Sequence, residues 1–146
     1  MQTVHRTALL PYPVAPVFDI VADVRSYPEF LPGCRRAVVH DEGSHELLAE
    51  LELDLQGVRT GFTTRNVLVP YERIELHLVS GPFKSFEGEW RFKRLGEDDG
   101  CKVELDLEFA LSGARAWLGG AFSGVFARAA DRLVDAFCER ARQVLG

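Results

Sequence analysis

Between residues 35 and 111, apolar and polar residues alternate with a period of two in several separate runs. One run places Ala49, Leu51, Leu53 and Leu55 in alternation with Glu50, Glu52, Asp54 and Gln56. Successive side chains of a β-strand point to opposite faces, so this pattern predicts strands with one apolar and one polar face. Turn residues such as Gly81 and Pro82 separate the runs and suit antiparallel hairpins. We therefore predict about six antiparallel strands here, in a sheet with one buried and one solvated face.

The residues before position 35 and after position 111 show other patterns of apolar residues and prolines. The segment Val4 to Leu10 is predicted as an edge strand, because prolines follow it directly. Apolar residues then recur at helical spacing, which predicts a first helix near residues 15 to 24. Two prolines bracket a compact apolar corner at residues 28 to 32. From Ala114 onward, apolar residues recur every three or four positions, so the last part is predicted as a single long helix.

The 146 residues, 47% of them hydrophobic, are enough for one domain over residues 1 to 146 with a single core. The net charge of -5 argues against binding nucleic acid through a bulk positive field. The three cysteines lack the spacing of a zinc site, so we expect neither a disulfide framework nor a metal. No signal-peptide core and no membrane-spanning apolar stretch is present, which together predict a cytoplasmic protein.

The long helix must cover the apolar face of the sheet, which makes the predicted fold class α+β. A curved sheet is wider than a helix, whose diameter is about 10–12 Å, so the space left over is either packed or a cavity. Residues 116 to 127 carry no charge and include three glycines, whereas residues 128 to 142 carry seven charges. The uncharged half of the helix, facing aromatic residues of the strands, suits an elongated apolar pocket.

Three motifs carry a resemblance to a known family: Tyr27 to Cys34 (YPEFLPGC), Thr64 to Asn66 (TRN) and Gly81 to Phe92 (GPFKSFEGEWRF). They are similar to motifs of the coenzyme Q-binding and ribosome association toxin branch of the START-like superfamily of polyketide cyclases and lipid transport proteins. The resemblance covers nearly the whole chain and implies a helix-grip fold, in which a curved antiparallel sheet of about seven strands wraps around the C-terminal helix. Gly33 stands where this family usually has tryptophan, and Leu145 where it often has an aromatic residue.

The resemblance also implies a site for a hydrophobic ligand between the sheet and the helix. The candidate ligand-binding residues are Tyr27, Phe30, Leu31, Phe62, Arg65, Asn66, Phe83, Phe86, Trp90, Trp117, Phe122 and Phe126. Two interpretations stand for Arg65 and Asn66, which either hydrogen-bond the headgroup of a quinone or lipid or form structural pairs with acidic neighbours. The aromatic residues either line a cavity or belong to the core. The corner at residues 27 to 31 either gates the cavity, docks on a partner or closes one end of the core.

Recognisable catalytic motifs are missing from the sequence. The four histidines are scattered, and no nucleophile elbow or phosphate loop is present. Alternating carboxylates such as Glu104, Asp106 and Glu108 lie on the polar face of a predicted strand. We therefore predict no catalytic residue, no metal ligand and no required cofactor. Polyketide cyclase or dehydrase chemistry is kept as a third alternative that rests on the superfamily alone.

For function, the resemblance implies a non-enzymatic protein that binds ubiquinone or another polyprenyl lipid and supports respiration, with peripheral contact to the inner membrane. The alternative that it implies is a ribosome association toxin, which binds the large ribosomal subunit and blocks subunit joining. Arg25, Arg35 and Arg36 are the candidate contacts to RNA or to the ribosome. The arginines between residues 128 and 142 are interleaved with acidic residues and are interpreted as a solvated helix face.

Overall fold

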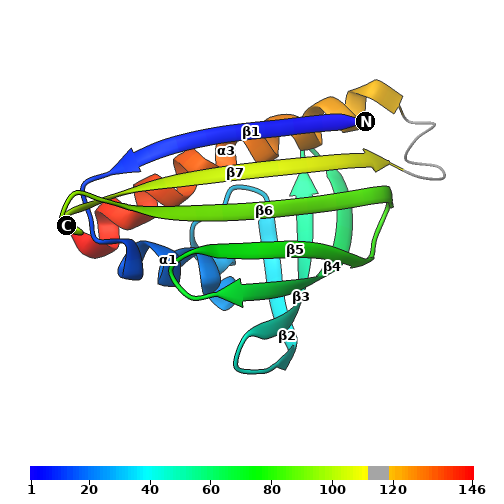
Figure 1. The fold of residues 1–146 in the computed structure, drawn as a ribbon. Helices are drawn as coiled ribbons and strands as arrows, with labels where there is room; N and C mark the ends of the chain where they lie inside the picture. Colours follow the sequence, from blue (N-terminus) through cyan, green and yellow to red (C-terminus); the bar gives the residue numbers. More distant parts are fainter. Residues whose placement is uncertain (112–118) are drawn as a thin grey trace.

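The computed structural model describes residues 1–111 and 119–146, with the side chains of the second segment from residue 124 onward. Seven strands and a long helix make up most of this part of the chain (Figure 1). In chain order the elements are β1 (Gln2–Leu10), α1 (Val14–Ala22), the 3-10 helix η1 (Val24–Glu29), β2 (Cys34–Glu42), β3 (Glu46–Leu55), β4 (Val58–Val69), β5 (Arg73–Ser80), β6 (Phe83–Leu95), β7 (Gly100–Leu111) and α3 (Gly119–Leu145).

The strands form one antiparallel sheet in the order β1-β7-β6-β5-β4-β3-β2. Strands β2 to β7 form a meander of hairpins, and β1 pairs with β7 at the far edge. The alternation places Val103, Leu105, Leu107 and Phe109 on the buried face. Helix α3 runs along the concave side of the sheet, and α1 lies beside its C-terminal end (Figure 1). The predicted α+β helix-grip fold, with a curved sheet around a long C-terminal helix, is confirmed.

The segment before β2 differs from the prediction. The first helix ends at Ala22, and a separate 3-10 helix follows from Val24 to Glu29, so the corner begins before Pro28 rather than at it. The backbone N–H groups of Phe30 and Leu31 both donate to the Tyr27 carbonyl, at 3.2 and 2.9 Å, and these bonds close the turn. The predicted start of the long helix at Ala114 falls outside the described residues.

Local irregularities bend the sheet near the β5–β6 hairpin. The register shifts between Thr63 and Thr64 in the β4–β5 pairing and between Phe83 and Ser85 in the β6–β7 pairing. Such bulges increase the local twist of the strands. Gly81 has a φ of +154°, and a Cβ atom at this position would lie 2.6 Å from the Phe62 Cβ atom. A side chain at Gly81 would therefore force the hairpin away from β4.

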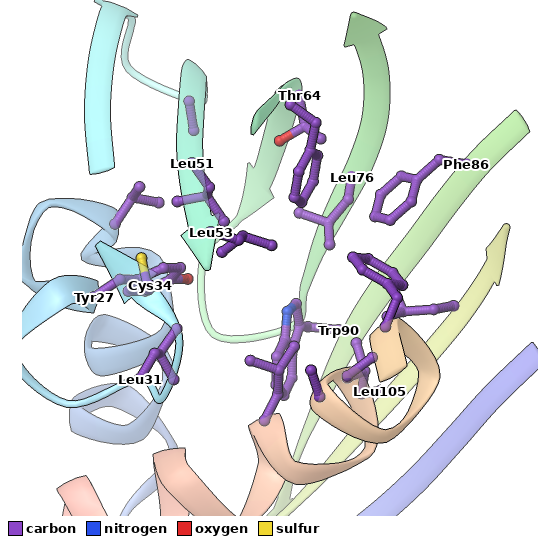
Figure 2. A pocket seen from close by; sticks show the side chains of 18 of the residues that line it. Tyr27, Leu31, Cys34, Leu51, Leu53, Thr64, Leu76, Phe86, Trp90 and Leu105 are labelled. Atoms are coloured by element: carbon purple, nitrogen blue, oxygen red, sulfur yellow. The ribbon is translucent and has the colours of Figure 1, made fainter. Parts of the chain in front are cut away.

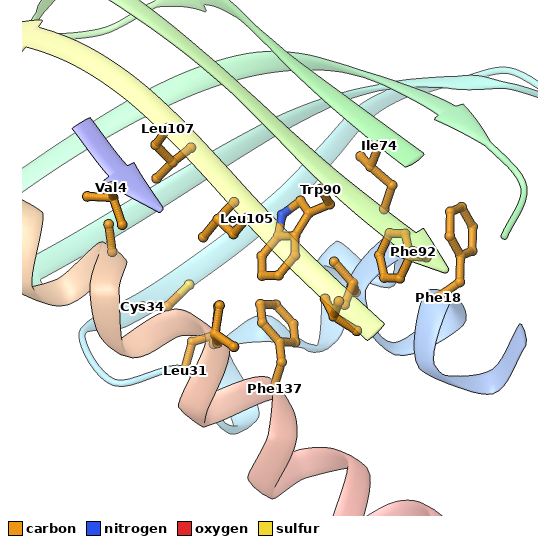
Figure 3. Packing of buried hydrophobic residues seen from close by; sticks show 14 of the residues in the cluster. Val4, Phe18, Leu31, Cys34, Ile74, Trp90, Phe92, Leu105, Leu107 and Phe137 are labelled. Carbon is orange, nitrogen blue, oxygen red and sulfur yellow. The ribbon is translucent and has the colours of Figure 1, made fainter. Parts of the chain in front are cut away.

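Aromatic contacts attach the helix to the sheet. The Phe126 ring of α3 lies 4.7 Å from that of Phe109 on β7 and 5.2 Å from that of Phe83 on β6, measured between centroids. Nearer the C-terminus, the Phe137 ring packs edge-on against Trp90 at 5.2 Å (Figure 3). No helix in the described part of the chain is both long and apolar enough to cross a membrane.

Polar contacts of charged side chains also connect the helices to the sheet and its turns. The Arg6 guanidinium of β1 contacts the Asp135 carboxylate of α3 at 2.8 Å and also the backbone carbonyl of Asp131. Hydrogen bonds from Arg6 to both residues raise the pKa of its guanidinium. The Asp98 carboxylate, in the turn between β6 and β7, accepts the backbone N–H of Val14 at 3.1 Å and so satisfies a donor at the start of α1.

We expect Phe109→Ala to lower the free energy of unfolding by about 3–5 kcal/mol, because a fully buried ring between β7 and α3 is lost and leaves a cavity. Urea denaturation followed by circular dichroism measures this change. The control is Leu9→Ala in β1, which is 69% exposed and should change stability by less than about 0.5 kcal/mol. Equal effects of the two substitutions would contradict the packing described.

Candidate functional site

An apolar cavity of about 110 Å³ lies between the concave face of the sheet, η1 and α3. Figure 2 shows its labelled side chains pointing into one space from β2, β3, β4, β5, β6, β7 and the corner after α1. The residues that line it are Val24, Tyr27, Leu31, Pro32, Cys34, Ala49, Leu51, Leu53, Leu55, Phe62, Thr64, Asn66, Leu76, Phe86, Trp90, Leu105, Leu107, Phe126, Ala129, Ala130, Leu133 and Phe137.

The cavity wall contains one polar pair on strand β4. Thr64 and Asn66 are two positions apart, so both side chains point inward, and each is 6% exposed. The Thr64 hydroxyl donates a 2.6 Å hydrogen bond to the Asn66 side-chain oxygen. That bond engages the oxygen of the Asn66 amide and does not engage its two N–H donors, and Asn66 lines the cavity. The wall can therefore offer a hydrogen bond to an acceptor atom of a ligand.

Strand β6 supplies aromatic walls on either side of a glycine. Phe86, Gly88 and Trp90 all face inward, because they occupy alternate positions. A Cβ atom at Gly88 would lie 2.4 Å from a methyl group of Leu107 and 3.1 Å from one of Leu76. Neighbouring leucines therefore occupy the space of the missing side chain, and both of them line the cavity.

The corner formed by η1 closes one end of the cavity. The Tyr27 hydroxyl donates to the Val21 carbonyl, and its ring contacts the Phe137 ring edge-on at 5.4 Å. Burial raises the pKa of the Tyr27 phenol, so the hydroxyl stays protonated and keeps its donor role. Burial also raises the pKa of the Cys34 thiol, which keeps this part of the wall uncharged near neutral pH.

The chemistry available in the cavity is that of binding. Among the described lining residues there is no Asp, Glu, His, Lys or Arg. Over the described ranges 1–111 and 119–146, no group of three or more His, Cys, Asp or Glu side chains is arranged to hold a metal ion. An uncharged wall with a few donors favours an apolar molecule that carries a hydrogen-bond acceptor.

The structure brings most of the predicted ligand-binding residues together. The ones that line the cavity are Tyr27, Leu31, Phe62, Asn66, Phe86, Trp90 and Phe126. Trp117 lies outside the described residues, as does the side chain of Phe122. Whether the lining residues bind a ligand is still a prediction.

Two predicted residues are buried or half-buried but do not line the cavity. The Phe83 ring lies among those of Phe62, Phe86, Phe109 and Phe126, where it joins sheet to helix. The Phe30 ring packs edge-on with the Phe137 ring at 5.3 Å between centroids, and the Arg140 guanidinium lies over the Phe30 ring, 5.0 Å from its centroid. Both rings thus support the wall from behind and do not form it.

Arg65 corrects a prediction. Its side chain is 59% exposed and lies on the outer face of the sheet, because it stands between the inward-facing Thr64 and Asn66. Its guanidinium is 3.6 Å from the Glu46 carboxylate of the neighbouring strand. Of the two interpretations, the structural ion pair therefore applies to Arg65, whereas Asn66 faces the cavity.

The candidate ribosome contacts lie at the surface in ion pairs. Arg25 pairs with Glu42 at 3.2 Å, Arg35 with Asp54 at 3.6 Å and Arg36 with Glu52 at 3.2 Å. Their side chains are all more than half exposed. These arginines are thus accessible, but their charge is partly compensated.

Several residues that line the cavity were not among the predicted ligand-binding residues, although the strand pattern contained them. Leu51, Leu53 and Leu76 belong to the apolar sides of alternating runs, and Thr64 lies two positions before Asn66 in the same motif. Extending the period of two from Phe62 identifies Thr64, and the alternation of the other runs identifies the three leucines. Ala129, Ala130 and Leu133 of α3 carry no such signal, because only packing shows which side of a helix faces a cavity.

Comparisons with known proteins agree with this fold and cavity. Residues 10–138 match the family described as polyketide cyclase / dehydrase and lipid transport. The ribosome association toxin RatA of Pseudomonas aeruginosa is 47% identical, over 98% of this chain and 97% of that protein. The mitochondrial coenzyme Q-binding protein COQ10 of Drosophila melanogaster is 24% identical, over 94% of this chain and 57% of that protein.

Among solved structures, the Zhui aromatase/cyclase of Streptomyces sp. R1128 superimposes with a TM-score of 0.87, over 99% of this chain and 96% of the other. At 20% identity this likeness shows the fold alone. A seven-stranded curved sheet, a long helix against it and an apolar cavity between them define a START-like protein. The chain belongs to the polyketide cyclase / dehydrase and lipid transport family. The resemblance inferred from its three motifs is confirmed.

Cys34 offers a chemical test of the cavity wall. The thiolate is the reactive form, and the raised pKa of Cys34 reduces its fraction. The rate of alkylation by iodoacetamide should therefore be slow near neutral pH and keep rising above about pH 8.5, where a free thiol is half ionised. Mass spectrometry of the Cys34 peptide gives this rate. Urea-unfolded protein is the control, and a folded-state rate that levels off at the same pH would contradict the burial.

Proposed function

We propose that the protein binds a hydrophobic small molecule in the cavity and does not transform it. The observation that carries this proposal is the uncharged, largely apolar wall of a space enclosed by three elements. Burying apolar surface contributes roughly 0.8 kcal/mol per CH₂ group, so a chain of about ten such groups is enough for micromolar affinity before the entropic costs of binding. No chemical step is needed for such a role.

A polyprenyl quinone, and ubiquinone in particular, is our candidate ligand. Its apolar tail matches the wall, and its carbonyl oxygens are acceptors suited to the Asn66 amide. A coenzyme Q-binding relative with 24% identity supports the same chemistry. We propose a location in the cytoplasm, with peripheral contact to the membrane where such a ligand dissolves.

Replacing either of two alanines of α3 by leucine tests ligand binding. Ala129→Leu places a larger side chain in the cavity wall and should weaken binding of a short-chain ubiquinone analogue about tenfold, because the added volume competes with the ligand. Ala136→Leu is the control, since this alanine lies on the same helix but does not line the cavity. Quenching of tryptophan fluorescence measures both affinities. Equal affinities for the two folded variants, or no binding by the unaltered protein, would contradict the proposal.

Ribosome association is the second candidate function, and a specific observation favours it. The 47% identical relative is a ribosome association toxin, and the match covers almost the whole length of both chains. The coenzyme Q-binding relative matches at about half that identity. We propose that the surface of this protein binds the large ribosomal subunit and blocks subunit joining, a role that leaves the cavity free to hold a ligand.

The ribosome proposal predicts a change in sucrose gradients. Overproduction should lower the fraction of joined ribosomes, and Arg35→Glu with Arg36→Glu should relieve this effect, because it reverses charge at an exposed site. The control is Arg94→Glu at the far end of β6, which is exposed to a similar degree. An unaltered gradient profile on overproduction would count against ribosome association. Equal relief by the control variant would count against a contact through Arg35 and Arg36.

Cyclase chemistry ranks third. A structural neighbour is an aromatase/cyclase, but the described lining residues of this cavity supply no carboxylate, histidine or lysine as acid or base. We therefore propose no reaction.

A further inference from the structure

A groove of about 180 Å³ adjoins the cavity at the end of the sheet where β3 turns into β4. The chain after η1, the β3–β4 turn and α3 form its sides. Pro32, Leu55, Ala129 and Leu133 line both the groove and the cavity. The same four apolar residues therefore border both spaces.

Two arginines of α3, Arg128 and Arg132, line the groove. They are four residues apart, so they lie on the same face of the helix. The Arg128 guanidinium folds back over Gly124, with one nitrogen 3.3 Å from where a Cβ atom would stand. A larger residue at position 124 would press on this guanidinium, and the glycine leaves room for it at the groove.

Among the residues that the structure describes, these two arginines differ from the other arginines because they have no acidic partner. Every other arginine in residues 1–111 and 124–146 takes part in an ion pair. The acidic neighbours on α3 are engaged elsewhere, because Asp131 and Asp135 contact Arg6, and Glu139 contacts Arg142. The interleaved charges of this helix therefore do not neutralise Arg128 and Arg132.

One carboxylate, that of Asp54, also lies in the groove. It is 3.6 Å from the Arg35 guanidinium and 3.5 Å from that of Arg59, so two cations already compensate its charge. Among the charged residues that line the groove, Arg128 and Arg132 are therefore the ones without an ion pair, and a bound anion would lie on the helix side of the groove.

We propose that groove and cavity together bind an amphiphile with an anionic headgroup, whose carboxylate or phosphate meets Arg128 and Arg132 while its chain enters the cavity between Leu55 and Leu133. This inference rests on the proposed binding of a hydrophobic ligand in the cavity, and it names a class of ligand other than the uncharged quinone. The cavity alone, at about 110 Å³, is smaller than the roughly 150 Å³ that holds one benzene ring in a protein core. A longer ligand must extend beyond it, and the groove behind the shared apolar wall is where its polar end meets two uncompensated cations.

The test compares two probes that differ only in the headgroup, oleic acid and oleyl alcohol, on delipidated full-length protein at about pH 8, where the acid is ionised. Displacement of a fluorescent apolar dye gives both affinities. We expect the acid to bind about tenfold more tightly than the alcohol at low salt, and the preference to shrink as salt screens the charges. In the double variant Arg128→Gln/Arg132→Gln, the affinity for oleic acid should fall to that for oleyl alcohol, while the affinity for oleyl alcohol should stay unchanged. Arg142→Gln, on the same helix but paired with Glu139, is the control and should keep the preference.

The outcomes separate this inference from the function on which it rests. Equal affinities for acid and alcohol in the unaltered protein would overturn the headgroup site but leave apolar binding intact. A preference that persists in the double variant would overturn the role of these two arginines. Failure of folded protein to bind either probe would overturn both proposals. Loss of ribosome co-sedimentation in the double variant, with the acid preference unchanged, would assign the arginines to RNA and also overturn the inference.

Discussion

The structure depends on a mismatch between a wide concave sheet and the single helix that covers it. Seven strands present a continuous apolar face, while one helix is about 10–12 Å across. Contacts such as that of Phe126 with Phe109 fix the helix over β7, near the β1 edge of the sheet. Under β3 and β4 the helix touches the sheet through the Phe126 and Phe62 rings, but it does not fill the space there. The corner around Tyr27 and Leu31 closes this side only in part, and the cavity is the remaining space.

The sheet and the long helix were predictable because their signals are local and repeated. A period of two over residues 49–55 and again over 103–109 defines which face is buried without any knowledge of the partner. The bulges at Thr63 and Phe83 carry no such signal, since they follow from how neighbouring strands pair. The same holds for the end of α1 at Ala22 and the 3-10 helix after it, which depend on the fit of the corner against Phe137.

Some residues of the candidate site could likewise be predicted from local sequence patterns, and others could not. Trp90 and Asn66 could be predicted as lining residues for two reasons. The strand period predicts that their side chains point to the buried face, and both residues belong to motifs shared with the family. For Arg65 the motif left two interpretations open, because a motif groups adjacent residues, whereas a strand sends them to opposite faces. Phe83 faces inward as expected, yet only the packing of several rings decides whether an inward aromatic residue joins a core or lines a space.

The walls of the cavity are held by different kinds of interaction, and this bears on how ligand and ribosome binding relate. Backbone hydrogen bonds fix the sheet side along its length. Side-chain contacts connect η1 to α3, namely the Tyr27 and Phe137 rings and the Arg140–Glu29 ion pair at 3.3 Å. A ligand larger than the empty space would therefore be accommodated by shifts of η1 and α3, because side-chain contacts shift at lower cost than a strand ladder. A ligand changes the affinity for a partner only if it favours one arrangement of the surface that the partner touches. Coupling between the two proposed functions would therefore require that the ribosome contacts η1 or α3.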